Sequence, residues 1–564
     1  MKFSDFEYRR PDMEALKQEF SNLLDQFENA KYFEAQSILV KKINALRSDY
    51  ESMNEIASIK FSIDTANEEY EREKDFFNEN TPIYKEYISR YYKALASSIF
   101  RNVLEKKWGK QLFKLAELTV KTFSPDIIED LQTENRLCSE YVKLIASAKI
   151  FFEGEERTLY GMAPFMMSKD RGMRKRAFEA RTAFMESIGE KLDDIYDRLV
   201  KVRAKMAHKL GYRDFVDLGY ARMNRTDYDS KLVLNFRRQV EETIVPIAIR
   251  LRERQRQRLG LNKLLYYDEL FNFNTGNPVP KGKSEWIVEN AKRMYSELSA
   301  ETAEYIRFMI DNELLELLNK KGKAGGAYCT YISRYKAPYI FANFNGTSDD
   351  VDTLTHEAGH AFQVYCSRDF DVPEYYWPTY EACEIHSMGM EFLTWPWMEL
   401  FFKEDTNKFK FMHISDALTF IPYAAAVDEF QHIVYGEPDM TPAERRRAWR
   451  QLEKKYMPHK DYEGNEYLES GAFWHIQSHI FEEPFYYIDY ALAQICALQY
   501  WKMSNESRHK AWSSYMKLCR LGGSKSFVNL LREAGLKLPF DKDCVKSVAG
   551  EIEGWLNSID DKKL

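Results

Sequence analysis

The segment His356-Glu357-Ala358-Gly359-His360 constrains the fold of this chain more than any other part of its sequence. Histidines four positions apart lie on the same face of an α-helix, about 5 to 6 Å apart, so both imidazoles can reach one metal ion. Glu357 can reach a water molecule beside such an ion. With ten histidines in 564 residues, chance yields only about 0.01 matches to this spacing. The sequence therefore predicts a metal-binding helix, against the alternative of an exposed helix that carries these residues fortuitously.

The length of the chain predicts more than one lobe. A chain of 564 residues exceeds the size at which a single compact core keeps growing, so a cleft between lobes is expected. Charged residues make up 30% of the chain and the net charge is -7, which is typical of an ordinary protein surface. Basic runs such as residues 445–450 are followed by acids such as Glu453, as on a solvated helix face. We therefore expect no nucleic-acid partner.

The amino terminus and the cysteines indicate where the protein resides. Residues 1–11 lack a long apolar core after their positive charges, and no uninterrupted apolar stretch of 18 residues occurs. We therefore expect neither a secretion signal nor a membrane span. The seven cysteines are odd in number, scattered and without a Cys-x-x-Cys pair, which suits reduced thiols. These features predict a cytoplasmic protein.

Helical periodicity dominates the first part of the chain. Between Pro11 and about Val200, apolar residues recur at spacings of three and four, which predicts amphipathic helices. The first such group comprises Leu16, Phe20, Leu23, Leu24 and Phe27. We predict an N-terminal helical lobe over residues 1–200 and a catalytic domain over residues 201–564, with a Gly- and Pro-rich loop at 274–282 inside it.

Two segments before the metal helix have the character of β-strands. Residues 325–332 and 337–344 are rich in aromatic and β-branched side chains and are bounded by Gly and Pro. Asn345 and Gly346 end the second strand, and the helix with the two histidines follows. An edge strand beside the metal could pair with an extended backbone. A purely structural strand is the alternative, and the sequence leaves both open.

A catalytic zinc needs one protein ligand beyond the two histidines. One class places a histidine six residues after the second, with a glycine at the turn. Here those two positions hold Cys366 and Gln363, so this class is disfavoured. Without the glycine turn the helix would continue and direct the Cys366 thiol away from the ion. The other solution is a glutamate on a second helix packed against the first.

Residues 378–393 predict that second helix and contain three glutamates. Glu381, Glu384 and Glu391 lie roughly on one helix face, so periodicity alone does not select the ligand. His386 lies on another face if Glu384 is the ligand. We then expect His386 to support the site or to be structural.

The motifs resemble those of the thimet oligopeptidase and oligoendopeptidase F family of zinc peptidases. The similarity begins with Asp352-Thr-Leu-x-His356-Glu-x-Gly-His360-Ala and Glu384-x-x-Ser387-x-x-x-Glu391. Further family-like segments are residues 325–329, 430–435, 479–491, 522–524 and 534–536. The resemblance covers roughly residues 320–540, whereas the first 200 residues match only in being helical. The chain length suits the shorter bacterial members, such as the Pz-peptidase-like ones.

The resemblance implies a fold and a set of metal ligands. The fold is mainly α, with two helical lobes around a deep substrate channel and a small β-sheet beside the zinc-binding helix. One zinc ion would be held by His356, His360 and Glu384, and Glu357 would act as the general base. Asp352, one helical turn before His356, is a candidate acceptor for the N–H of a ligand imidazole. A solvent-facing acid at the helix amino terminus is the alternative for Asp352.

The resemblance also implies hydrogen-bond donors for the oxyanion of the tetrahedral intermediate. The candidates are His479, Tyr486 and Tyr490. Larger animal members space their histidine and tyrosines differently and have a Gly-Gly pair where this chain has Glu482-Glu483. Which tyrosine faces the oxyanion therefore stays open.

By this resemblance we expect an intracellular zinc endopeptidase that cuts short, unstructured oligopeptides. A zinc carboxypeptidase of related fold is one alternative, and it would need a cation for the terminal carboxylate of its substrate. An inactive, zinc-dependent binding protein is another. The retained Glu357 argues against it, because structural zinc sites need no general base and are usually closed by four ligands.

Overall fold

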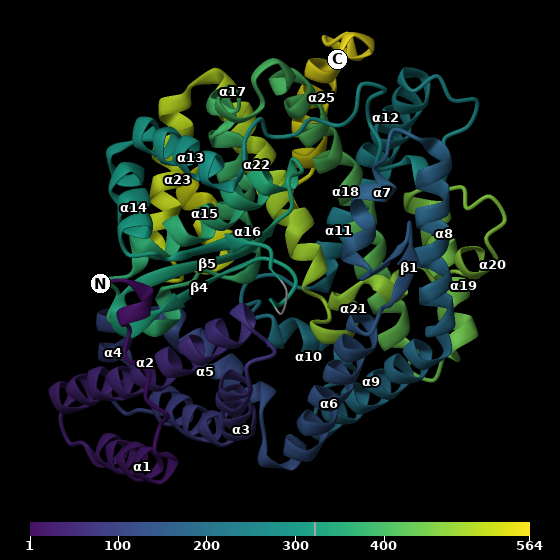
Figure 1. Ribbon diagram of the computed structural model, residues 1–564. Helices are drawn as coiled ribbons and strands as arrows, with labels where there is room; N and C mark the ends of the chain where they lie inside the picture. Colours follow the sequence, from purple (N-terminus) through teal and green to yellow (C-terminus); the bar gives the residue numbers. More distant parts are fainter. Residues whose placement is uncertain (321–322) are drawn as a thin grey trace.

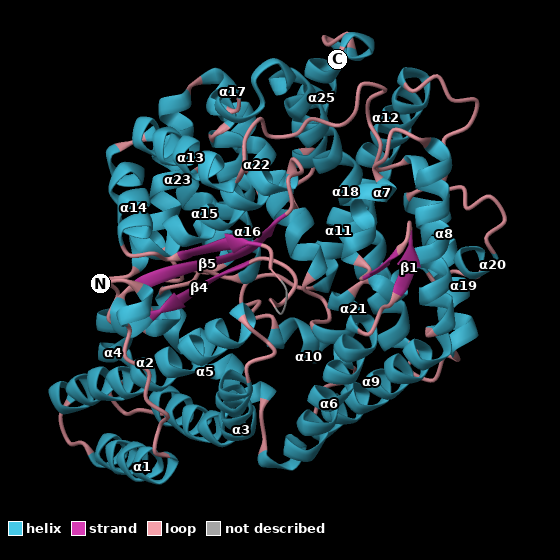
Figure 2. Ribbon diagram, in the orientation of Figure 1, coloured by secondary structure: helices cyan, strands magenta, loops and turns pink. Residues whose placement is uncertain are grey.

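The computed structural model describes residues 1–320 and 323–564 and consists mainly of helices, as Figures 1 and 2 show. The helices up to residue 258 are α1 (Met13–Asn29), α2 (Phe33–Ile63), α3 (Glu68–Ala96), α4 (Arg101–Trp108), α5 (Lys110–Thr122), α6 (Ile128–Ala146), α7 (Ala163–Met166), α8 (Arg171–Ser187), α9 (Gly189–Lys209), α10 (Phe215–Arg222), α11 (Ser230–Gln239) and α12 (Val245–Arg258). Those that follow are α13 (Ser284–Leu298), α14 (Ala300–Asp311), α15 (Asp349–Ser367), α16 (Tyr380–Leu393), α17 (Glu399–Phe402), α18 (Thr406–Gly436), α19 (Pro442–Tyr456), α20 (Glu466–Glu469), α21 (Ser478–Glu482), α22 (Tyr487–Glu506), α23 (Arg508–Leu521), α24 (Phe527–Ala534) and α25 (Cys544–Asn557). In the described ranges, no helix is both long and apolar enough for a membrane crossing.

The helices form two halves. One half contains the larger sheet with α13–α16 and α23, and α1–α5 lie beneath that sheet (purple in Figure 1). The other half contains α6–α9, α12 and α18–α21. Helix α22 contacts both α16 and α18 and so connects the halves. The predicted fold, mainly α with two helical lobes and a small sheet, is confirmed.

The amphipathic pattern at the start of the chain forms α1. The side chain of Asp12 caps this helix by accepting hydrogen bonds from the backbone N–H groups of Glu14 and Ala15. Phe20, Leu24 and Phe27 are completely buried, as their spacing predicts. Helix α1 packs on α2 and α3, and α2 in turn contacts the sheet. The first helices therefore form a layer attached to the half that carries the metal helix.

The larger sheet has three strands in the order β3-β5-β4. Strands β4 (Tyr328–Ile332) and β5 (Ala337–Phe344) are antiparallel and confirm the two predicted strands. Strand β3 (Leu315–Leu318) runs parallel to β5. In the described ranges, β4 forms an edge of this sheet, and α15 contacts both β4 and β5. The sheet thus lies directly beside the metal helix.

A second, two-stranded sheet lies where only helices are predicted. Strands β1 (Ile150–Phe152) and β2 (Glu155–Arg157) form an antiparallel hairpin. Its turn consists of Glu153 and Gly154, whose φ angles are 48° and 83°. The helical pattern of residues 11–200 therefore does not extend to this hairpin. Strands of three residues are too short for the alternation that identifies a strand.

Helices α15 and α16 cross at very short range, and Gly359 makes this possible. A Cβ atom on Gly359 would lie 2.4 Å from the His386 carbonyl oxygen and 2.7 Å from the Ser387 Cα atom. Both atoms belong to the backbone of α16, so neither can move aside independently of that helix. The glycine inside the His-Glu-x-x-His segment therefore sets the distance between the two helices.

Replacing Gly359 by alanine tests this contact. We expect Gly359→Ala to lower the free energy of unfolding by about 1 to 3 kcal/mol through overpacking. The matched control is Gly550→Ala in α25, since nothing lies within 4 Å of a Cβ atom there. The control should keep or slightly raise stability, because alanine favours a helix by up to about 1 kcal/mol over glycine. Thermal unfolding measures both, and equal midpoints for the two variants would contradict the close-packing account.

Candidate active site

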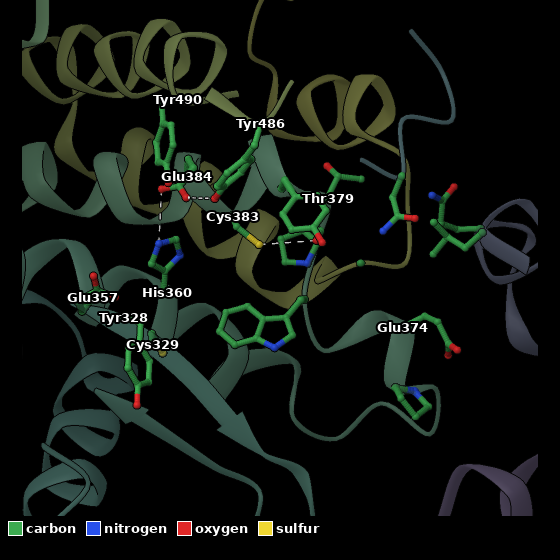
Figure 3. Close-up of a pocket in the computed structure, with 18 of the residues that line it drawn as sticks. Tyr328, Cys329, Glu357, His360, Glu374, Thr379, Cys383, Glu384, Tyr486 and Tyr490 are labelled. Carbon is green, nitrogen blue, oxygen red and sulfur yellow. Dashed lines mark hydrogen bonds and ion pairs between the residues drawn. The ribbon is translucent and has the colours of Figure 1, made fainter. Parts of the chain in front are cut away.

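Three potential metal ligands converge where α15 and α16 cross. Oε2 of Glu384 lies 3.3 Å from Nε2 of His356 and 3.5 Å from Nε2 of His360. The three donor atoms all lie within 4.8 Å of one another. Ligand atoms bound at about 2.0 to 2.1 Å around a tetrahedral ion lie roughly 3.3 Å apart, so the donors fit zinc. Figure 3 shows His360 directed at Glu384.

The structure distinguishes the three glutamates of α16. Glu384 faces both histidines, and Tyr486 donates a hydrogen bond to its other oxygen at 2.7 Å. Burial alone would raise the pKa of Glu384, but the nearby imidazoles hold it well below its usual range. Glu381 is fully buried elsewhere, near Arg225. Glu384 is therefore the carboxylate placed to share an ion with the two imidazoles.

The remaining glutamate, Glu391, holds the first histidine in place. Its Oε1 lies 2.7 Å from Nδ1 of His356, and its Oε2 lies 2.8 Å from Nε2 of His413. The indole N–H of Trp395 donates to Nδ1 of His413 at 3.0 Å. Glu391 therefore occupies the place predicted for Asp352, and that prediction is wrong. Asp352 is partly buried, and burial raises its pKa to about 8.

His386 is structural. Its ring is completely buried, and its Nδ1 lies 2.6 Å from the carbonyl oxygen of Ala382. Burial lowers the pKa of His386 to about 4, so the ring is neutral. Its own carbonyl oxygen accepts a hydrogen bond from Tyr515 at 2.7 Å. These contacts fix α16 at the point where it passes Gly359.

Glu357 faces the cavity beside the three candidate metal ligands. Its side chain lines the space in front of His356 and His360, yet the residue is only 6% exposed. Burial raises the pKa of Glu357, and the two neighbouring histidines partly oppose this effect. A carboxyl group with a raised pKa is suited to accept a proton and to return it near neutral pH.

The predicted oxyanion donors take different positions. Tyr486 and Tyr490 line the cavity, and Figure 3 shows both rings close to Glu384. His479 is not among the lining residues, and its Nε2 lies 3.5 Å from the Tyr490 hydroxyl. Burial raises the pKa of both tyrosines, so both remain O–H donors. His479 therefore contacts the Tyr490 hydroxyl without lining the cavity itself.

The ligands open into a cavity of about 620 Å³ between parts of the chain that are distant in sequence. Tyr92, Gln111, Leu115 and Thr119 come from the first helices, and Tyr328 and Cys329 come from β4. Trp377 and Tyr380, which the sequence did not single out, complete an aromatic wall. The only signal for them is the aromatic and proline-rich run between the two ligand helices.

The cavity wall carries little charge away from the metal ligands. Within the described ranges, its lining contains neither Lys nor Arg. Among the described lining residues, Glu374 is the only carboxylate besides Glu357 and Glu384. It is neutralised by Arg47, whose Nη1 lies 2.7 Å away, and it accepts a hydrogen bond from Tyr92.

The loop between α15 and α16 attaches the first helices to this wall. The Tyr375 hydroxyl donates to the Trp108 carbonyl at 2.8 Å and accepts from the Leu112 N–H at 3.0 Å. From the opposite side, the Gly523 N–H donates to the Tyr375 carbonyl at 3.0 Å. A Cβ atom on Gly523 would lie 2.2 Å from the Trp377 carbonyl oxygen. The family-like Gly522-Gly523 pair therefore allows the chain to lie directly against the backbone of the loop that carries the aromatic wall.

Comparisons with known proteins find peptidases among the similar proteins. The chain is similar to an oligoendopeptidase F homolog of Borreliella burgdorferi, 25% identical over 385 residues, which are 66% of this chain and 63% of that protein. It is also similar to the oligopeptidase PepF of Bacillus subtilis, 22% identical over 396 residues, which are 66% of this chain and 55% of that protein. The chain thus matches less than two thirds of the length of these relatives.

A solved structure of Pz peptidase A with an inhibitor matches over 100% of both chains, with a TM-score of 0.97 and 61% identity. The model of the peptidase M3 N-terminal domain matches residues 3–123, and that of peptidase family M3 matches residues 165–550. These matches confirm the resemblance inferred from the sequence motifs. The family model covers more than half of the sequence, and the chain therefore belongs to peptidase family M3.

Proposed function

We propose that this protein is a zinc-dependent oligopeptidase that hydrolyses internal bonds of short, unstructured peptides. The observation that carries the proposal is the convergence of His356, His360 and Glu384 beside Glu357 in one cavity. When bound, zinc supplies a Lewis acid that polarises the scissile carbonyl and makes water more acidic. All seven cysteines are free thiols, which supports action in the reducing cytoplasm.

In this proposal Glu357 moves the proton. Its carboxylate accepts a proton from the attacking water and returns it to the amine that leaves. Its position on α15, one residue after a ligand histidine, directs it into the same space as the metal ligands. Burial makes the carboxylate more basic, which favours this proton transfer.

Tyr490 and the edge strand β4 would hold the substrate. Tyr490 would donate a hydrogen bond to the oxyanion, and Tyr486 would keep Glu384 in place through the hydrogen bond between them. The backbone of a peptide in extended form would pair with the edge strand β4, whose Tyr328 and Cys329 line the cavity. An extended peptide can enter a cavity of about 620 Å³, whereas a folded domain cannot.

The cavity favours internal cleavage over carboxypeptidase action. A carboxypeptidase binds the terminal carboxylate of its substrate with a cation. The described cavity lining has neither Lys nor Arg, and Arg47 is already paired with Glu374. An inactive binding protein is disfavoured because Glu357 is retained and three ligands leave a position open.

Two substitutions separate metal binding from proton transfer. We expect Glu357→Gln to keep about one zinc per chain and to lower kcat by about 10² to 10⁴, since general base catalysis is lost. Glu384→Ala should lose most of the metal. Zinc content by mass spectrometry and turnover of a fluorogenic peptide measure both effects. Full turnover by Glu357→Gln would refute the mechanism, and stoichiometric zinc in Glu384→Ala would refute the ligand assignment.

The two tyrosines can be assigned by kinetics. We expect Tyr490→Phe to lower kcat about 100-fold with little change in KM, because one oxyanion donor is lost. The neighbouring Tyr487, which does not line the cavity, provides the control Tyr487→Phe with nearly unchanged kcat. A wild-type kcat for Tyr490→Phe would remove this residue from the catalytic machinery.

A peptide blocked at both ends tests the position of cleavage. Acetylated and amidated peptides lack the terminal charges that exopeptidases bind, so an endopeptidase should still cut them. We expect mass spectrometry to find two fragments from one internal cut, one with the acetyl group and one with the amide. Cleavage only after the carboxyl terminus is unblocked would establish the carboxypeptidase alternative instead.

A further inference from the structure

We propose that His413 is a positioning residue that sets the zinc affinity of the site, acting through Glu391 on His356. This proposal rests on the zinc site of the proposed function. His413 lies on α18 and Trp395 follows α16, so the first metal ligand is tied to an element outside the α15–α16 pair. The chain of contacts runs from Trp395 through His413 and Glu391 to His356.

The proton on His413 can be located from its neighbours. The indole N–H of Trp395 can only donate, so Nδ1 of His413, 3.0 Å away, must accept. A neutral His413 therefore carries its proton on Nε2, which lies 2.8 Å from Oε2 of Glu391 and donates to it. Trp395 thus selects the tautomer that allows His413 to bind the carboxylate.

The hydrogen bonds continue from Glu391 to the first metal ligand, His356. With Oε2 of Glu391 occupied by His413, Oε1 accepts the N–H of His356 at 2.7 Å. This fixes the His356 proton on Nδ1 and leaves the Nε2 lone pair facing Glu384, where it would bind the ion of the proposed site. A carboxylate that accepts from a ligand imidazole orients the ring and makes it a stronger ligand.

His413 itself is held firmly. Its ring stacks on Phe409 with 5.6 Å between ring centroids and 9° between ring planes. It also packs against Phe392 at 4.8 Å. The side chains of His413 and Glu391 are only 11% and 13% exposed. Without the His413 N–H, Oε2 of Glu391 would be a largely buried acceptor that lacks this donor. The free-energy cost of this loss favours movement of the Glu391 carboxylate away from its present position.

The test compares zinc dissociation constants, measured by competition with a chelator of known affinity. His413→Phe keeps a ring for packing but removes the donor to Glu391, and we expect its dissociation constant to rise about 10- to 100-fold. His413→Gln restores an N–H donor, and its value should return to within about threefold of the wild type. A merely structural role would lower the stability of the metal-free protein without this pattern of loss and rescue.

The matched control is His432→Phe. His432 lies on the same helix, and its Nε2 lies 3.4 Å from Oδ2 of Asp428 and 3.2 Å from the Tyr220 hydroxyl. It therefore shares the partly buried histidine–carboxylate chemistry of His413 but has no contact with the metal ligands. Its zinc dissociation constant should equal that of the wild type.

Each outcome decides the proposal. A folded His413→Phe with a wild-type dissociation constant would overturn it, as would an equal increase in His432→Phe. If His413→Phe does not fold, Trp395→Phe replaces it: a weaker zinc affinity supports the proposal and an unchanged one overturns it. Failure of the wild type to bind zinc would instead refute the proposed metal site and, with it, the proposed function.

Discussion

The close crossing of α15 and α16 is the constraint on which the rest of the site depends. The missing side chain at Gly359 brings the backbone of α16 near enough for Glu384 to stand 3.3 and 3.5 Å from the two histidines. Elements around this crossing maintain it: the larger sheet contacts α15, and α22 contacts α16. A methyl group added at Gly359 would push the two helices apart and move a candidate ligand relative to the others. Zinc coordination tolerates little such movement.

The loop between α15 and α16, which forms part of the cavity wall, is held from two sides by segments that are far apart in the sequence. Tyr375, between the ligand helices, is bonded to α5 on one side and to Gly523 on the other. The first helices and the carboxyl-terminal region therefore hold the same aromatic wall. Because that wall carries almost no free charge, we infer that binding there relies on apolar contacts and backbone hydrogen bonds. This suits substrates that are recognised as extended chains.

Local patterns predicted the metal helix, β4, β5 and the mainly helical fold, because each rests on residues close together in sequence. Periodicity left Glu381, Glu384 and Glu391 open, and only the family resemblance pointed to Glu384, because the crossing point of two helices is not contained in the pattern of one helix. Asp352 was a candidate acceptor for a ligand imidazole because it lies one turn before His356, whereas Glu391, which contacts His356 in the structure, arrives from another helix. Trp377 lies in a loop, which carries no periodicity, and Tyr380 is only the first residue of α16, so no local pattern marks either residue. The domain boundary near residue 200 stays a prediction.

X-ray absorption at the zinc edge tests the central claim most directly, because it reports the atoms bound to the ion. Zinc-loaded protein should show only nitrogen and oxygen neighbours at about 2.0 to 2.1 Å, with the outer-shell scattering of two imidazoles. Cys329 and Cys383 line the same cavity and offer the competing ligands. A sulfur neighbour at about 2.3 Å, or the scattering of fewer than two imidazoles, would contradict the assignment of His356, His360 and Glu384.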